Sequence, residues 1–191
     1  MSRPQNTLSM TYVTRLLAGA PRQGVSLASL FTAVGLDPAR LDDPEGRVSG
    51  SEVILLVQEV MRQTHDEFIG LAEGARSKPG TFSMMAHAVI NCPTLGKAIQ
   101  RSIHFYGLFQ APVRSRFEVV DNEGRLIFEL QENSSYAETI HEAMIFISVR
   151  FWSWLVGRRL DPLVIEFAHE APPKAAEFQA LFRCPVSYGM E

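Results

Sequence analysis

Apolar side chains in roughly the first hundred residues recur at the three- and four-residue spacing of helices. In the run GVSLASLFTAVG, Leu27, Leu30 and Phe31 share one helical face, and Ser26 stands where an N-cap is expected. The helices that this pattern predicts cover 9–20, 27–34, 53–64, 66–75, 81–92, 95–109 and, further along, 136–157.

Three more of these helices carry capping signals at their start. Ser49 and Glu52 have the spacing of a capping box, and Thr94 can cap the helix that follows it. Asp66 stands where it would cap the short helix over 66–75.

The pattern of apolar positions changes after the helix over 95–109. Residues 114–132 alternate in period two, and the turn signal DNEG at 121–124 predicts a β-hairpin. After the long helix over 136–157, a strand-like run at 163–169, a helix over 173–182 and a terminal strand starting near Cys184 suggest a small βαβ-like segment. We therefore expect an α+β fold that is mostly helical: a helical N-terminal half, a β-hairpin, a long buried helix and the βαβ-like segment.

The stretch GVSLASLFTAVGLDPARL at 24–41 has the outline of a helix-turn-helix. Such a motif needs a second helix that fills the major groove and cationic side chains that meet phosphates. Pro44 and Gly46 end the second helix early, and the segment after Gly35, LDPARLDDPEGR at 36–47, carries Asp37, Asp42, Asp43 and Glu45 against Arg40 and Arg47. We expect this stretch to pack within the domain and not to read DNA.

Composition and charge set further limits. The chain has 191 residues, 46% of them hydrophobic and 20% charged, which suits one globular domain or two small ones. The net charge of −3 gives no electrostatic reason to approach a polyanion. The N-terminus shows no signal peptide, and the only cysteines, Cys92 and Cys184, stand far apart, so we expect a soluble, cytoplasmic protein.

The candidate catalytic and metal motifs are incomplete. The run HEAMI begins like a zinc-protease helix but has Ile145 where the second histidine belongs. His169 and Glu170 follow a predicted strand, where polar residues are usually solvated. We expect no enzyme activity, no cofactor and no metal.

Two predicted helices carry more aromatic bulk than one packing face requires, and this surplus is the main functional signal. The second of these helices contains His141. A buried histidine needs a polar partner, either a backbone carbonyl or a ligand in a cavity. Helices 95–109 and 136–157 would flank such a cavity, and an apolar effector would suit it. The candidate ligand-binding residues are Met85, Phe105, Tyr106, Phe109, His141, Met144 and Trp152.

Four segments taken in order resemble a known family. They are VGLDPARLDDPEGRV, THDEFIGL, PGTFSMMAHAVINCPTLGKAI and PLVIEFAHEAP. Together they resemble the N-terminal, arabinose-binding-type regulatory domain of AraC-family transcription regulators, which are bacterial proteins. The most specific parts are the run from Thr64 to Leu71 and CPTLGKAI at 92–99.

The resemblance implies an effector-sensing regulatory domain over 1–191. The change of pattern along the chain allows two subdomains within it, helical over 1–110 and mixed α/β over 111–191. It also implies a C-terminal helix-turn-helix domain that contacts promoter DNA. No such pair of helices follows Cys184, so we expect the chain to be the N-terminal part of a longer regulator. The expected partners are a small, apolar or carboxylate-bearing effector, a second copy in a homodimer, and promoter DNA only through the other domain, with no membrane. The alternative is a dimerisation or interaction domain that holds no small molecule.

Overall fold

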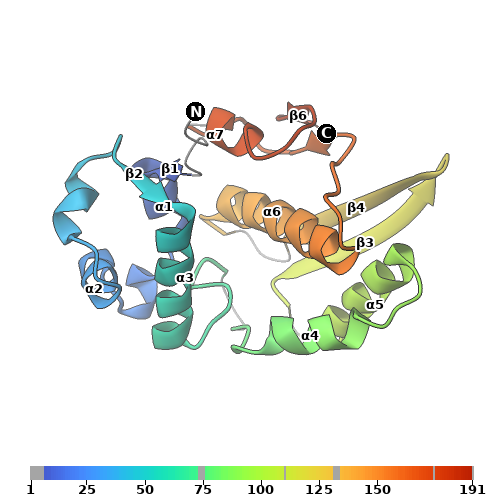
Figure 1. Ribbon diagram of the computed structural model, residues 1–191, viewed down its shortest axis with the longest axis horizontal. Coiled ribbons are helices and arrows are strands. Elements are labelled where there is room, and N and C mark those ends of the chain that lie inside the picture. The colour runs from blue at the N-terminus through green and yellow to red at the C-terminus, as the bar shows by residue number, and fades with distance from the viewer. Residues whose placement is uncertain (1–6, 73–75, 110, 131–133, 174, 191) are drawn as a thin grey trace. The chain divides into compact units, whose positions relative to one another are not determined.

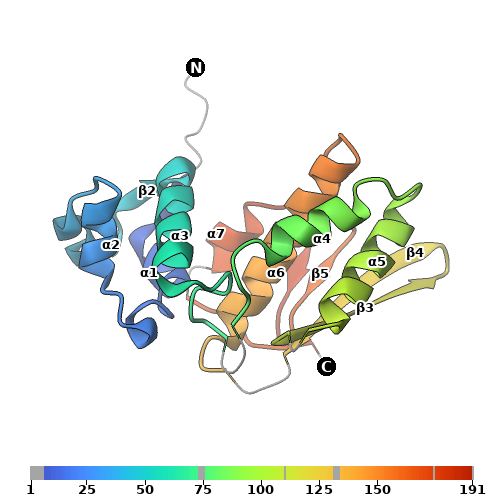
Figure 2. The same cartoon turned by 90° about the horizontal axis from the view of Figure 1, so that it is seen from below.

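The computed structural model describes residues 7–72, 76–109, 111–130, 134–173 and 175–190. The chain divides into two compact units, Met1–Thr81 (unit 1) and Phe82–Glu191 (unit 2). Short sheets accompany the helices, which confirms the mostly helical α+β prediction (Figures 1 and 2). The subdomain boundary that the sequence suggested at residue 110 falls inside unit 2. None of the helices in the described ranges is both long and apolar enough to cross a membrane.

Unit 1 joins three α-helices to a small sheet. Its elements are β1 (Thr7–Ser9), α1 (Met10–Leu16), the 3-10 helix Pro21–Gln23, α2 (Leu27–Ala33), the 3-10 helix Pro38–Asp42, β2 (Arg47–Ser49) and α3 (Gly50–Thr64). β1 and β2 pair antiparallel, which the sequence did not predict because three-residue strands show no alternation. Val13, Leu30, Phe31, Leu56 and Val60 are fully buried and form the centre of its core.

Two of the three caps predicted in unit 1, at Ser26 and Ser49, form at the expected places. The Ser26 hydroxyl accepts from the Ser29 N–H at 3.1 Å at the start of α2. Ser49 and Glu52 make both bonds of the capping box at the start of α3. The helix predicted over 66–75 is wrong over its described part: residues 67–70 form turns, and 73–75 lie outside the described residues.

Unit 2 combines helices with two separate two-stranded sheets. Its elements are α4 (Thr81–Val89, whose first residue belongs to unit 1), α5 (Leu95–Gly107), β3 (Val113–Val120), β4 (Glu123–Leu130), α6 (Ala137–Leu155), β5 (Ile165–Glu166), α7 (Ala175–Gln179) and β6 (Val186–Ser187). The Lys97 N–H donates to the Thr94 hydroxyl at 3.3 Å, so Thr94 caps α5 as predicted.

The predicted hairpin and βαβ-like segment both occur in unit 2. β3 and β4 pair antiparallel around a turn in which Asp121 and Asn122 have φ of 50° and 66°. Positive φ at both central residues is the mark of a type I′ turn. β5 and β6 pair parallel with α7 between them, although α7 covers only part of the helix predicted over 173–182. Figure 2 shows α5 running beside the hairpin.

Candidate functional site

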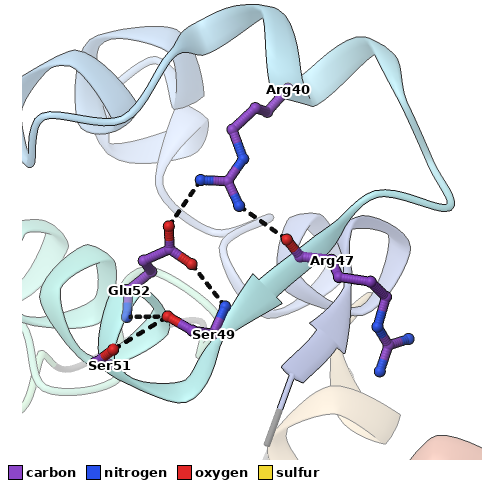
Figure 3. Close-up of polar contacts among 5 residues, drawn as sticks. All are labelled: Arg40, Arg47, Ser49, Ser51 and Glu52. Carbon is purple, nitrogen blue, oxygen red and sulfur yellow. Dashed lines mark hydrogen bonds and ion pairs between the residues drawn. The ribbon is translucent and has the colours of Figure 1, made fainter. Parts of the chain in front are cut away.

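The opening helix-turn-helix outline does not become a DNA-reading motif. Its second element, Pro38–Asp42, is a short 3-10 helix and not a recognition helix. The Arg40 guanidinium donates to Glu52 Oε1 and to the Arg47 carbonyl, both at 2.8 Å (Figure 3). Arg47 donates in turn to the Thr7 carbonyl at 2.6 Å and the Thr7 hydroxyl at 3.1 Å. Both arginines therefore bind within unit 1.

Glu52 is the centre of this polar group. Besides Arg40, it accepts from the Ser49 N–H at 2.6 Å (Figure 3). The hydrogen bond from Arg40, followed by that from the Ser49 backbone, lowers the pKa of the Glu52 carboxyl from 4.5 to about 2. The carboxylate is thus ionised over a wide pH range and holds the 3-10 helix against the start of α3.

Asp66, in the most family-like run of the sequence, is a buried turn organiser and not a helix cap. Its side chain accepts from the N–H groups of Phe68 at 3.0 Å, Gly70 at 2.9 Å and Ser77 at 3.1 Å. It is 1% exposed, so these bonds replace the water that the carboxylate loses. The bond to Ser77 fixes the stretch of chain that leaves the core of unit 1.

The glycine of the same run allows two backbones to meet. Gly70 has φ of +77°, and a Cβ placed there would lie 2.4 Å from the Gly19 carbonyl oxygen. A Cβ on Gly19 would lie 2.3 Å from the Gly70 carbonyl carbon. The resemblance between Thr64 and Leu71 therefore reflects packing, and this part of unit 1 is a scaffold.

Unit 2 brings four of the predicted ligand-binding residues together. Met85 of α4 and Trp152 of α6 belong to a buried group that we call the apolar cluster. Phe105 and Tyr106 of α5 pack against it. The other buried members are Val89, Ala98, Ile99 and Phe151. Helices α4, α5 and α6 therefore converge on one apolar centre.

Trp152 has a polar atom in this apolar setting. Its indole Nε1 is buried and has no hydrogen-bond partner among the described residues. A buried indole N–H usually finds an acceptor, since leaving it unpaired costs free energy. The apolar cluster thus contains one donor whose partner the described chain does not supply.

The remaining predicted residues lie elsewhere in unit 2. Phe109 packs on Phe105 with ring centroids 5.2 Å apart but is 55% exposed. Met144 is half-buried on α6. His141 pairs with His169, with centroids 6.2 Å apart and ring planes only 5° from parallel.

We call His141, Phe167, His169, Phe178 and Tyr188 the histidine cluster, because each of these rings packs against at least one other ring of the group. His169 lies 4.8 Å from the Phe167 ring and 5.6 Å from the Tyr188 ring, between centroids. Phe167 packs on Phe178 at 5.6 Å. Both Nε2 atoms of the histidine pair are buried and have no hydrogen-bond partner among the described residues.

Burial, and secondarily the charge on His169, lowers the pKa of His141 below its usual value of 6.5. The imidazole is therefore neutral at neutral pH. From the sequence, His169 was expected to be solvated and neither Phe167 nor Tyr188 stood out, because their meeting with α6 depends on the fold of β5 and β6. The only signal in the sequence for this cluster was the position of His169 at the end of a predicted strand, two residues after the aromatic Phe167.

Two further features limit what the site can do. A small pocket on α6, with room for about one water molecule, is lined by Ser153, Leu160 and Phe182 among others. Within the ranges that the structure describes, no three His, Cys, Asp or Glu side chains are grouped to hold a metal ion. The buried polar atoms of unit 2 that we consider for a ligand are the ring nitrogens Trp152 Nε1, His141 Nε2 and His169 Nε2.

Comparisons with known proteins agree with the sequence resemblance. Residues 24–191 match the model of the arabinose-binding domain of AraC transcription regulators, an N-terminal domain. The ornithine utilization regulator of Pseudomonas aeruginosa is 26% identical over 189 residues, which cover 95% of this chain and 55% of that protein.

Two uncharacterized HTH-type transcriptional regulators, from Mycobacterium bovis and Mycobacterium tuberculosis, are also similar. Each is 28% identical over 122 residues, which cover 62% of this chain and 36% of the regulator. The chain thus spans about half, or less, of the length of the curated relatives that it matches.

Proposed function

The chain belongs to the family of N-terminal arabinose-binding domains of AraC transcription regulators, and we propose that it senses a small-molecule effector within a longer regulator. The family match and the names of the relatives make it a regulatory domain. A domain of this kind carries no catalytic step, and promoter DNA is contacted by another part of the regulator. Sensing and the class of effector are the finer parts of the proposal.

The observation that supports sensing is the set of unpartnered ring nitrogens in unit 2. Trp152 Nε1, His141 Nε2 and His169 Nε2 are buried in aromatic surroundings without a hydrogen-bond partner in the described chain. Ligand sites are mostly apolar with a few placed polar groups, and this composition matches them. The effector that suits such a site is small, and apolar or carboxylate-bearing.

The binding residues we propose are those predicted from the sequence, now divided between two places. Met85, Phe105, Tyr106 and Trp152 contribute at the apolar cluster, with Phe109 at its exposed edge. His141 contributes from the histidine cluster, and Met144 lies between His141 and Trp152 on α6.

Native mass spectrometry and thermal unfolding of the purified chain test this function. Native mass spectrometry reports a retained small molecule and the number of subunits in one spectrum. Thermal unfolding is then followed with a fatty acid, an aromatic acid, arabinose and ornithine, the last two suggested by the names of the family and of one relative. We expect at least one compound to be retained or to raise the melting temperature, as ligands that bind only the native state do. A chain that carries nothing and responds to no compound would contradict sensing.

Filling the space beside α6 sharpens the test. Met144→Trp is expected to abolish the ligand response of a chain that still folds, because the larger ring occupies the volume of the ligand. In a solid core the same change would overpack and cost about 1–3 kcal/mol. Met84→Trp is the matched control, since Met84 is 64% exposed on α4.

A second candidate is an interaction domain that pairs with another copy. Exposed apolar side chains on α4 and α6 favour it: Trp154, 62% exposed, stacks on Phe151 at 5.8 Å, and Phe82 meets Phe151 at 5.1 Å. Sedimentation at tens of micromolar, roughly the range of a modest interface, is expected to show a homodimer that Trp154→Lys converts to monomer. A parent chain that is monomeric there would assign pairing to another part of the regulator.

A further inference from the structure

We propose that the His141–His169 pair binds the acidic group of the effector, and that the effector is a small organic acid with an apolar body. The inference rests on the proposed sensing function and names the chemical class of its ligand. It also places the ligand's head group at the histidine cluster, away from the apolar cluster that the sequence favoured.

The geometry of the pair leaves two nitrogens ready for one ligand. The rings are 5° from parallel with centroids 6.2 Å apart, and both Nε2 atoms are buried without a partner in the described residues. Each unpaired buried polar atom costs free energy, so a pair of them in one place calls for a shared occupant. A carboxylate has two oxygens and can meet both rings.

The hydrogen bonding of His169 decides what that occupant must supply. Its Nδ1 lies 2.8 Å from the Glu170 carbonyl oxygen, which can only accept. Nδ1 therefore carries the proton, and Nε2 of the neutral ring holds a lone pair. The missing partner of His169 is thus a proton donor.

An organic acid satisfies both rings in a balanced step. The proton of the carboxylic acid moves to Nε2 of His169 and forms the Nε2–H bond. The electron pair of the broken O–H bond stays on the carboxylate. An imidazolium–carboxylate ion pair results, with no other reactant. His141, in the tautomer with its proton on Nε2, donates to the second carboxylate oxygen. Charge-assisted hydrogen bonds of this kind are the strong ones, and burial strengthens them further.

The walls of the site favour an apolar ligand body. Phe167 is 4% exposed and lies 4.8 Å from the His169 ring, and behind it Phe178 is fully buried. Tyr188 stacks on Phe167 at 5.2 Å and lies 5.6 Å from the His169 ring, between centroids. A metal ion is a poorer occupant, because no third histidine, cysteine or carboxylate joins the pair in the described ranges and transition metals need more protein ligands.

Binding of an acid to this pair must depend on pH. Titratable groups on the surrounding elements are Glu138 and Glu142 of α6, Glu166 and Glu170 beside β5, Glu177 of α7 and Tyr188 after β6. Burial already lowers the pKa of His141, so this ring is neutral at neutral pH before an acid binds. A carboxylate that binds there takes up about one proton, and its affinity falls as the pH rises above about 6.5.

Isothermal titration calorimetry of the 191-residue chain tests this linkage. The probes are octanoate and benzoate, each with its neutral amide, in two buffers of different ionisation enthalpy at about pH 7 and pH 8. We expect uptake of about one proton per bound acid, about tenfold weaker binding at the higher pH, and at least about tenfold weaker binding of the amides.

Variants assign the effect to the pair. His169→Asn and His141→Asn are each expected to abolish proton uptake and to weaken acid binding at least about tenfold. His104→Asn is the control, because His104 is exposed on α5 and takes no part in the cluster. Circular dichroism checks that each variant folds. If a histidine variant fails to fold, His169→Gln is tested in its place.

Three results would overturn the inference. Acid binding without proton uptake, or unchanged by both histidine substitutions, would place the head group elsewhere. Tighter binding of the amides than of the acids would leave sensing intact but assign a neutral effector. Titration with Zn²⁺ that binds the parent and not the histidine variants would make the pair a metal site. Sensing itself falls only if the broader panel and native mass spectrometry also show no ligand.

Discussion

Selected polar side chains of units 1 and 2 differ in how they are partnered. In unit 1 the Asp66 carboxylate is 1% exposed and accepts three backbone N–H bonds, and the Glu52 carboxylate accepts from Arg40 and Ser49. In unit 2 the Nε2 atoms of His141 and His169 and the Nε1 atom of Trp152 are buried without a partner in the described chain. A satisfied polar network fixes one structure, whereas unsatisfied groups store free energy that a ligand can release. The proposed sensing therefore belongs to unit 2, and we propose that unit 1 is its scaffold.

The largest effect is expected when the network of unit 1 is broken. Asp66→Ala leaves three N–H donors without their acceptor in a buried turn and is expected to cost about 3 kcal/mol of unfolding free energy. Urea unfolding followed by circular dichroism measures the loss. Asp42→Ala, an exposed aspartate of the same unit, serves as control and should change stability little. Equal stability of the two variants would show that Asp66 does not organise the turn.

A smaller loss is expected at the start of α5. Thr94→Ala removes the hydroxyl that accepts from the Lys97 N–H and should cost about 1 kcal/mol. Gln100→Ala on the exposed face of the same helix is the control. A melting temperature that does not change with Thr94→Ala would mean that water caps the helix equally well.

The Arg40–Glu52 pair should contribute about 0.5 kcal/mol, as partly exposed ion pairs do. The pKa of Glu52 is lowered from 4.5 to about 2 in the folded chain. A lowered carboxyl pKa contributes stability above pH 4.5 and loses it as the pH falls towards 2. The gap in melting temperature between Glu52→Gln and the parent should therefore shrink between pH 7 and pH 3. Glu123→Gln, in the exposed hairpin, should show no comparable trend, and a gap that stays constant would contradict the pairing.

The smallest change in stability is expected in the histidine cluster. His141→Phe replaces a ring whose Nε2 has no described partner by an apolar ring of similar shape. Such exchanges are nearly neutral or stabilising, so the unfolding free energy should not fall by more than about 1 kcal/mol. Urea unfolding decides this, and a loss as large as that of Asp66→Ala would show that His141 has a strong partner within the fold.

Local signals in the sequence predicted local structure well. Ser26, Ser49 and Thr94 cap the helices that they precede, because a cap bonds to a backbone N–H only a few residues away. The hairpin turn followed in the same way from adjacent residues, Asp121 and Asn122.

Residues whose partners lie far along the chain were not predicted correctly. Asp66 was expected to cap a helix, but one of its hydrogen-bond partners, Ser77, lies far beyond the turn that follows Asp66 in the chain. His169 was expected to be solvated, although the fold brings it to His141 of α6. Of the candidate ligand residues, Met85, Phe105 and Tyr106 meet Trp152 in the apolar cluster. Helix periodicity put these side chains on apolar helix faces, whereas the site of His141 depends on the parallel pairing of β5 and β6.

Hydrogen–deuterium exchange of the whole chain, with and without a ligand found in the panel, tests the division between the units most directly. We predict that bound ligand slows exchange in peptides of α6 and of the segment from β5 to β6, since these hold the histidine cluster. Peptides of α1, α2 and α3 should exchange at the same rate in both states. Protection concentrated in those three helices, with none around His141 and His169, would contradict the assignment of sensing to unit 2.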